Sequence, residues 1–232
     1  MTRPIDEILE EQKAYYRARA DEYDEWFYRR GRYDRGEPHN SDWFREVGEI
    51  EAALASLGPL GDVLEIAAGT GIWTTRLCEA AKNVVALDSS REVLNLNREK
   101  NKSDKILFEC ADIFEWQAPQ KFDLVFFSLW LSHVPEEKFE LFWSVVDSQL
   151  KPGGRWFLID SLPDEFSRAY DHTITDKNDI AHRKLNDGRQ FQVVKRFYEP
   201  EKLSERLRGL GWENKIRTTQ RFFLFGSGKK SR

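Results

Sequence analysis

A short segment, "DVLEIAAGTGIWT", holds the residues whose types and spacing point most directly to chemistry. An apolar run reaches Glu65, Gly69 and Gly71 follow, and an apolar helical pattern then resumes. Glycines in a turn between a strand and a helix let a ligand approach the backbone closely. A carboxylate beside such a turn disfavours a pyrophosphate and favours a cationic ligand. The segment therefore predicts a site for a nucleotide-like ligand that carries positive charge and no phosphate.

The same loop has to be weighed against a dinucleotide site. The dinucleotide fingerprint reads Gly-x-Gly-x-x-Gly, with the pyrophosphate on the N-terminus of the following helix. Here Thr74 occupies the place of the third glycine. A nicotinamide-dependent oxidoreductase is therefore the less favoured interpretation.

Alternating strands and helices are expected to position this loop. Apolar strands that alternate with helices are typical of a parallel sheet covered on both faces. The pattern predicts strands over 62–67, 83–88, 105–112, 122–130, 155–161 and 221–226, and helices over 70–81, 90–101, 137–150 and 199–211. A turn is expected at 151–154. This order predicts an α/β fold.

The other segments flank this core. Apolar residues recur at helical spacing through residues 8–33, which predicts one amphipathic helix. A second helix is expected over 41–57, with Ser41 or Asp42 as its N-cap. Asp187-Gly188 favours the tight turn of a β-hairpin within 182–198. We expect a single domain over 1–232, with N-terminal helices or a lid in 1–58, a cofactor-binding core in 59–161, a covering insertion in 162–198, and a closing helix and strands in 199–228.

The composition limits the classes of partner. The chain has 232 residues, with 36 basic and 40 acidic side chains and a net charge of -4, which argues against a general nucleic-acid binder. No apolar run has the length of a membrane span, and the first residues are too charged for a secretory signal. We expect Cys78 and Cys110 to be reduced, buried thiols of a cytoplasmic protein. We also expect no metal, no nucleic-acid or membrane partner, and a monomer or a homodimer.

These motifs resemble those of the class I S-adenosylmethionine-dependent methyltransferases. The first loop of that family reads acid-x-Gly-x-Gly-x-Gly. Glu65, Gly69 and Gly71 match it, whereas Ala67 replaces the first glycine. We expect this replacement to be tolerated unless position 67 requires a positive φ. Asp88 ends the next strand, where the resemblance implies an acid that binds the ribose hydroxyls.

Later segments resemble the same family in the same order. Asp112, in "CADIF", matches the family's contact to the adenine amino group, with Ile113 beside the ring, although Asp112 would also serve as a helix N-cap. The resemblance covers about residues 15–225 and implies a Rossmann-like methyltransferase fold: a seven-stranded, mostly parallel sheet with helices on both faces, an N-terminal helical lid and an inserted β-hairpin. It implies S-adenosylmethionine as methyl donor and S-adenosylhomocysteine as product. The implied cofactor-binding residues are Tyr16, Arg19, Tyr23, Glu65, Ala67, Gly69, Gly71, Asp88, Ser89, Asp112, Ile113 and Ser128.

The acceptor side is suggested by a closer resemblance. The segments "YYRARADEYD", "WLSHVPEEKFELFW" and "LNDGRQFQVVK" resemble the bacterial phosphonate O-methyltransferase of dehydrophos biosynthesis and its relatives. Arg183 and Lys195 stand on either side of the Asp187-Gly188 turn. Counting outward from the turn predicts that they lie near each other and bind one anion, a phosphonate or a carboxylate. Alternatively, they belong to a solvated face of the hairpin.

Four more residues have two readings each. His133 follows the fourth strand, where it would accept a proton from a hydroxyl acceptor or donate to an anionic one, or else pack without a task. Trp130 either walls the acceptor site or fills the core. Tyr16 and Tyr23 either belong to a lid that meets the methionine carboxylate together with Arg19, or form a core stripe.

The sequence thus predicts an enzyme that transfers a methyl group in line from S-adenosylmethionine to a small molecule. O-methylation of an anionic or hydroxyl acceptor is favoured, and an already ionised acceptor would need no strong base. The Asn/Asp-Pro-Pro-Tyr signature of nucleic-acid amino methyltransferases does not occur. N- or C-methylation of an amine or a quinone, and a non-catalytic S-adenosylmethionine-binding module, are the alternatives.

Overall fold

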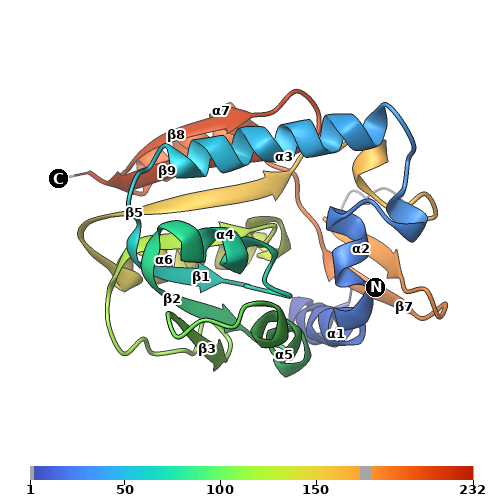
Figure 1. Ribbon diagram of the computed structural model, residues 1–232, viewed down its shortest axis with the longest axis horizontal. Helices are drawn as coiled ribbons and strands as arrows, with labels where there is room; N and C mark the ends of the chain where they lie inside the picture. The colour runs from blue at the N-terminus through green and yellow to red at the C-terminus, as the bar shows by residue number, and fades with distance from the viewer. Residues whose placement is uncertain (1–2, 173–178, 232) are drawn as a thin grey trace.

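A seven-stranded sheet forms the centre of the computed structural model, which describes residues 3–172 and 179–231 (Figure 1). The strands are β1 Gly61–Ile66, β2 Ala81–Asp88, β3 Ile106–Cys110, β4 Phe122–Ser128, β5 Leu150–Ser161, β8 Trp212–Thr218 and β9 Phe223–Lys230. Their order is β3-β2-β1-β4-β5-β9-β8, with the first five parallel and β9 antiparallel to both of its neighbours. The expected mostly parallel α/β sheet is confirmed.

Buried apolar strands explain why the sheet is parallel at its centre. Leu64 of β1 pairs with Val125 of β4, and both side chains are fully buried. A strand buried on both faces needs helices above and below it, which crossover connections supply. β5 begins at Leu150, so the turn predicted at 151–154 is instead an irregular stretch of strand, where the register against β4 shifts.

Helices cover both faces. On one face, α3 His39–Ala55 and α4 Ile72–Ala80 pack Trp43, Ile50 and Leu77 against the sheet. On the other, α6 Phe139–Gln149 and α7 Pro200–Gly209 contribute Phe142 and Leu207. The fifth helix of the core, α5 Arg91–Lys100, follows β2 and is capped by Ser90.

A separate two-stranded sheet packs on the first helix. β6 Ile180–Lys184 and β7 Gln190–Val194 form the predicted hairpin, and α1 Ile5–Ala18 lies against β7. Tyr15 packs with Ala181, Leu185 and Val193 in a small core of their own. Figure 1 shows α1, α2 and β7 gathered at the end toward which β1 and β2 point. Both proposed covering elements therefore lie together beside the carboxyl ends of the parallel strands.

The N-terminal region differs from the predicted single helix. It is divided into α1, a 3-10 turn at Ala20–Glu22, α2 Tyr23–Phe27 and a second 3-10 turn at Gly31–Tyr33. Arg29 then has a φ of 55°, which no α-helix can accommodate. The next helix begins at His39 after Pro38, without a side-chain cap, so the expected cap at Ser41 or Asp42 is wrong. A proline is tolerated at the start of a helix because the backbone N–H groups of the first turn have no acceptor within the helix.

The expectation that both thiols are buried is also wrong. Cys78 is half-buried, and Cys110 is exposed. Cys110 ends β3, which is an edge strand of the sheet and pairs with β2. In residues 3–172 and 179–231, no helix combines the length and apolar character that crossing a bilayer requires.

Candidate functional site

Two adjoining cavities lie at the carboxyl ends of the parallel strands. The smaller one, the strand-end cavity, has a volume of about 70 Å³ and is lined by residues that follow β1, β2, β3 and β4. The larger one, the basic cavity, has a volume of about 550 Å³ and is lined by the N-terminal region, the hairpin and the segment after β5. Tyr16, Tyr23, Leu129 and His133 line both cavities. These four residues mark the place where two bound molecules would meet.

Asp88 anchors the glycine loop at the end of β2. Its carboxylate accepts hydrogen bonds of 2.9 Å from the backbone nitrogens of Gly69 and Ser90. Burial nevertheless raises the pKa of Asp88 to about 6. Asp88 and the exposed Ser89 both line the strand-end cavity. Asp88 is thus held beside the loop, in position to accept hydrogen bonds from a ligand.

The glycine loop uses left-handed backbone at three positions. Gly69 and Gly71 have φ values of 54° and 85°. Ala67 has a φ of 55°, so the condition under which its replacement of glycine would matter is met. An alanine in this region costs about 1–2 kcal/mol. The exception that was made for a positive φ at position 67 therefore applies.

Glu65 lies behind the loop rather than in the strand-end cavity. The residue is 2% exposed, and its carboxylate accepts a hydrogen bond of 2.5 Å from the Thr74 hydroxyl. Burial raises the pKa of Glu65 to about 8. Glu65, Ser128 and Leu129 line a small adjoining hollow. A cation bound beside this hollow would favour the ionised form of Glu65.

The two residues expected at the adenine end have different surroundings in the structure. Ile113 is buried and lines the strand-end cavity. The Asp112 carboxylate instead accepts a hydrogen bond of 3.0 Å from the Phe114 backbone nitrogen and lies 3.1 Å from Nζ of Lys13 on α1. Asp112 therefore fastens the first helix across the end of the cavity in this conformation.

Unsatisfied polar atoms indicate that the strand-end cavity suits a polar ligand. Ser128 and Trp130 both line it. In the described part of the chain, neither Oγ of Ser128 nor Nε1 of Trp130 has a hydrogen-bond partner, although both atoms are buried. Buried donors are normally paired, so a ligand with acceptor atoms fits here. The Asp88 carboxylate adds a hydrogen-bond acceptor and Ile113 an apolar surface to the same cavity.

Three tyrosine rings surround Arg19, at the edge of the basic cavity. Its guanidinium carbon lies 5.0 Å from the ring centroid of Tyr23 and 5.7 Å from that of Tyr33. It also donates a hydrogen bond of 3.1 Å to the Tyr33 hydroxyl. The sequence reading missed Tyr33, because it follows a break in the helix that the apolar spacing does not reveal. Within the described ranges this is the one hydrogen bond of the Arg19 side chain, so its other N–H groups are available to an anionic group.

Both ring nitrogens of His133 are hydrogen-bonded. Nδ1 lies 2.5 Å from the Val194 carbonyl oxygen, and Nε2 lies 2.7 Å from the Tyr16 hydroxyl. A carbonyl only accepts, so Nδ1 carries the proton and Nε2 accepts from Tyr16. Burial, with Lys195 nearby, holds the pKa of His133 well below its usual value. The lone pair that a general base would use is therefore already engaged.

The register of the hairpin separates Arg183 from Lys195. Arg183 pairs with Phe191, and Lys195 follows the end of β7, where its nitrogen bonds the carbonyl of Asp179. Counting outward from the turn therefore does not place the two as cross-strand partners, but both line the basic cavity. The reason is that Arg183 lies nearer the Asp187-Gly188 turn along β6 than Lys195 does on the other strand, so the two residues occupy different rungs of the hairpin.

Lys195 is the more buried of these two cations, and an acid that the sequence reading missed holds it. Its Nζ donates to the hydroxyls of Ser132 at 2.8 Å and Ser161 at 2.6 Å and lies 3.4 Å from the Asp160 carboxylate. Asp160 is 2% exposed and ends the buried part of β5. An acid at the carboxyl end of a parallel strand is the signal that could have found it. Burial lowers the pKa of Lys195.

Leu129 also escaped the sequence reading. It has a φ of 55°, which is uncommon for a branched side chain, and its nitrogen donates a hydrogen bond of 2.7 Å to the Ile159 carbonyl. Strained backbone of this kind concentrates at functional sites. Nothing in the sequence marks the position, because a positive φ at leucine follows from tertiary packing alone.

Comparisons with known proteins agree with this geometry. A family model described as a methyltransferase domain matches residues 63–154. The structure of a DhpI–SAH complex is 34% identical, with a TM-score of 0.75, and the match covers 97% of each chain. A DhpI–SAM–HEP complex is 35% identical, with a TM-score of 0.78, over 96% of this chain and 97% of that one. The cypemycin N-terminal methyltransferase of Streptomyces sp is 34% identical over 110 residues, which are 46% of this chain and 44% of that protein. The chain thus spans less than half the length of this curated relative.

Proposed function

The chain belongs to the class I S-adenosylmethionine-dependent methyltransferases, and we propose that it methylates an oxygen of a small anionic acceptor, a phosphonate or a carboxylate. The observation that carries the proposal is the basic cavity, which meets the strand-end cavity at Tyr16, Tyr23, Leu129 and His133. A cation-lined cavity next to a methyl-donor site suits an acceptor that arrives already ionised.

The strand-end cavity is the proposed donor side. S-adenosylmethionine, when bound, supplies a methyl group that its sulfonium has already made electrophilic. Asp88 would bind the ribose hydroxyls, Ile113 would pack on the adenine, and Arg19 would bind the methionine carboxylate. The unpaired atoms of Ser128 and Trp130 support this assignment, because they need a polar partner. The residues bind and orient the donor and exclude water around it.

The basic cavity is the proposed acceptor side. Lys195 and Arg183 would hold the anionic group, and Trp130 and His133 would wall the place where it meets the methyl group. Because both His133 nitrogens are engaged, we assign His133 a positioning role and not that of a base. An ionised phosphonate or carboxylate oxygen requires no base. The likeness to DhpI, a dehydrophos phosphonate methyltransferase, supports the same acceptor class.

An amine acceptor is the rival, and the Streptomyces relative bears the name of an N-terminal methyltransferase. Arg183, which lines the same cavity, disfavours it here, since a protonated amine would be repelled by the guanidinium.

A two-stage experiment tests the proposal. Calorimetric titration with S-adenosylhomocysteine should show binding that Asp88→Ala abolishes. Methyl transfer from S-adenosylmethionine is then measured with matched phosphonates, carboxylates, phenols and primary amines. Turnover of the phosphonates or carboxylates, lost in Lys195→Gln, is the expected result. Turnover confined to amines or phenols would contradict it.

A further inference from the structure

Among the described residues, cationic side chains outnumber acidic ones in the lining of the basic cavity. Five cationic side chains line it: Arg19, Arg168, Arg183, Lys195 and Arg221. Two of the five are neutralised. Asp160 lies 3.4 Å from Lys195, and Asp164 lies 3.2 Å from Arg221.

The other three cations have no such partner. Across residues 3–172 and 179–231, no carboxylate approaches within 4 Å of Arg19, Arg168 or Arg183. Glu165 also lines the cavity, but it is exposed to solvent. His172 lines the cavity without adding charge, because burial lowers its pKa to about 4. A half-buried group of cations is unfavourable unless a ligand brings the opposite charge.

Arg168 belongs to a wall that is fixed in place. We call residues 164–168 the wall segment. Nε1 of Trp26 donates a hydrogen bond of 2.7 Å to the Ser167 carbonyl. The Arg35 guanidinium donates to the carbonyls of Glu165 at 2.9 Å and Arg168 at 3.3 Å. These contacts fix the backbone of the segment, so Arg168 is presented to the cavity from a rigid support.

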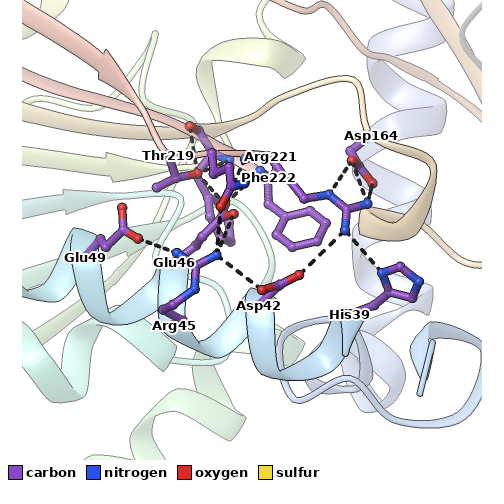
Figure 2. Close-up of polar contacts among 11 residues, drawn as sticks. His39, Asp42, Arg45, Glu46, Glu49, Asp164, Thr219, Arg221 and Phe222 are labelled. Atoms are coloured by element: carbon purple, nitrogen blue, oxygen red, sulfur yellow. Dashed lines mark hydrogen bonds and ion pairs between the residues drawn. The ribbon is translucent and has the colours of Figure 1, made fainter. Parts of the chain in front are cut away.

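A polar network holds the first residue of the wall segment from behind. Figure 2 shows Arg221 between Asp164 and His39, with Asp42 on the same side. The Arg221 guanidinium lies 3.1 Å from Nδ1 of His39. The fully buried Glu46 in turn accepts a hydrogen bond of 2.8 Å from the Phe222 nitrogen and so fixes the turn that carries Arg221. The charge of Arg221 is therefore used within the protein, whereas no carboxylate of residues 3–172 or 179–231 pairs with Arg168.

The free cations lie on different elements. Arg183 extends from β6, on the hairpin that also leads to Lys195, and Arg168 extends from the wall segment after β5. The cavity volume of about 550 Å³ is within the range of sites that enclose drug-sized ligands, and exceeds what a phosphonate of two or three carbons would fill. Arg19 is assigned to the methionine carboxylate, which leaves Arg168 and Arg183 to the acceptor.

We propose that the acceptor is an elongated molecule with two anionic groups. One group receives the methyl group beside Lys195 and Arg183, and the second binds Arg168 on the wall segment. This inference rests on the proposed function, because it assumes that the basic cavity binds the acceptor. It adds that tight binding of the acceptor requires a second anionic group in the same molecule, at a distance from the group that is methylated.

Calorimetry on the protein loaded with S-adenosylhomocysteine tests the proposal. The probes are ω-phosphonoalkanoates of increasing chain length and the matched ω-phosphonoalkanamides, which lack the second charge. At one chain length, the acid should bind about 10- to 100-fold more tightly than its amide, as expected for one hydrogen-bonded charge. Arg168→Gln should remove that difference, Arg168→Lys should retain part of it, and Arg183→Gln should weaken acid and amide alike. Arg208→Gln, on the exposed face of α7, is the matched control and should change neither.

The outcomes separate the two proposals. Equal binding of acid and amide at every length, or an unchanged ratio in an Arg168→Gln protein that melts like the wild type, would overturn the second anionic group. Phosphonate binding would still support the proposed function in that case. If neither acids nor amides bind to the loaded protein, the anionic-acceptor function itself is wrong.

Discussion

The hydroxyl of Tyr16, on α1, donates a hydrogen bond of 2.7 Å to Nε2 of His133, which follows β4. Nδ1 of the same ring donates to the Val194 carbonyl at the end of β7. The Gln12 side chain makes two hydrogen bonds at the same place. Its Nε2 donates to the His133 carbonyl at 3.2 Å, and its Oε1 accepts from the Val194 nitrogen at 3.0 Å. The first helix, the end of β4 and the hairpin are therefore joined through one histidine.

This arrangement predicts that His133 does not act as a base. His133→Ala should lower kcat with a phosphonate or carboxylate acceptor by less than about tenfold, whereas removing a general base costs roughly 10²- to 10⁴-fold. His133→Gln, which keeps polar atoms in the same space, controls for packing. A loss of several hundredfold in both variants would identify a base and contradict the ionised acceptor.

Asp160 should set the pH range over which Lys195 binds the acceptor. Lys195 attracts an anion only while protonated, so acceptor affinity falls as the pH rises through its pKa, which burial lowers and Asp160 partly restores. In Asp160→Asn the pKa of Lys195 falls further, and affinity should be lost at a lower pH than in the wild type. Titration of a phosphonate against pH measures this shift. An unchanged or upward shift would show that Lys195 is not the binding cation.

Gly71 should tolerate substitution far less than Gly69. A Cβ on Gly71, where φ is 85°, would overlap with the side-chain amides of Asn97 and Asn101. At Gly69, with a φ of 54°, the nearest atoms belong to the Tyr23 ring at 3.8 Å. Gly69→Ala should therefore cost about 1 kcal/mol of unfolding free energy from backbone strain. Gly71→Ala should cost about 1–3 kcal/mol more, from overpacking. Chemical denaturation of both variants distinguishes the two positions, and equal costs would contradict this packing of the loop.

Ala67→Gly should stabilise the protein, against the usual effect of this substitution. The φ of 55° at position 67 strains an alanine by about 1–2 kcal/mol, and glycine removes that strain. The greater freedom of glycine in the unfolded chain offsets about 0.4–1 kcal/mol of the gain. Ala68→Gly, at a neighbour without positive φ, is the control and should destabilise. A lower midpoint of denaturation for both variants would argue against strain at position 67.

Glu65 should make the protein less stable as the pH rises. Its pKa is about 8 when folded and near 4.5 when unfolded, so between these values the native state holds the extra proton. The free energy of unfolding therefore falls as the pH increases from about 4.5 to about 8. Glu65→Gln removes this contribution, so the free energy of unfolding of the variant should rise relative to that of the wild type as the pH increases over that range. Parallel stability curves for the two proteins would show that Glu65 is ionised in the native state throughout.

The sequence alone determined the alternation of strands and helices in the core and the position of the glycine loop. Apolar strands alternating with helices can only bury both faces in a covered parallel sheet, and a glycine loop after the first strand then lies at the carboxyl edge. Asp88, Gly69 and Ile113 all line the strand-end cavity, because each lies at or just after the carboxyl end of a parallel strand. The hairpin was found as well, since Asp-Gly favours a tight turn.

The tertiary structure decided the relations between segments far apart in the sequence. Asp160 neutralises Lys195, and Tyr16 occupies the nitrogen that made His133 a candidate base. Neither contact leaves a local pattern, because each depends on how α1 and the hairpin pack at the strand ends. The strained backbone at Ala67 and Leu129 was hidden for the same reason. Only tertiary packing can hold a non-glycine residue in a left-handed conformation that its own side chain disfavours.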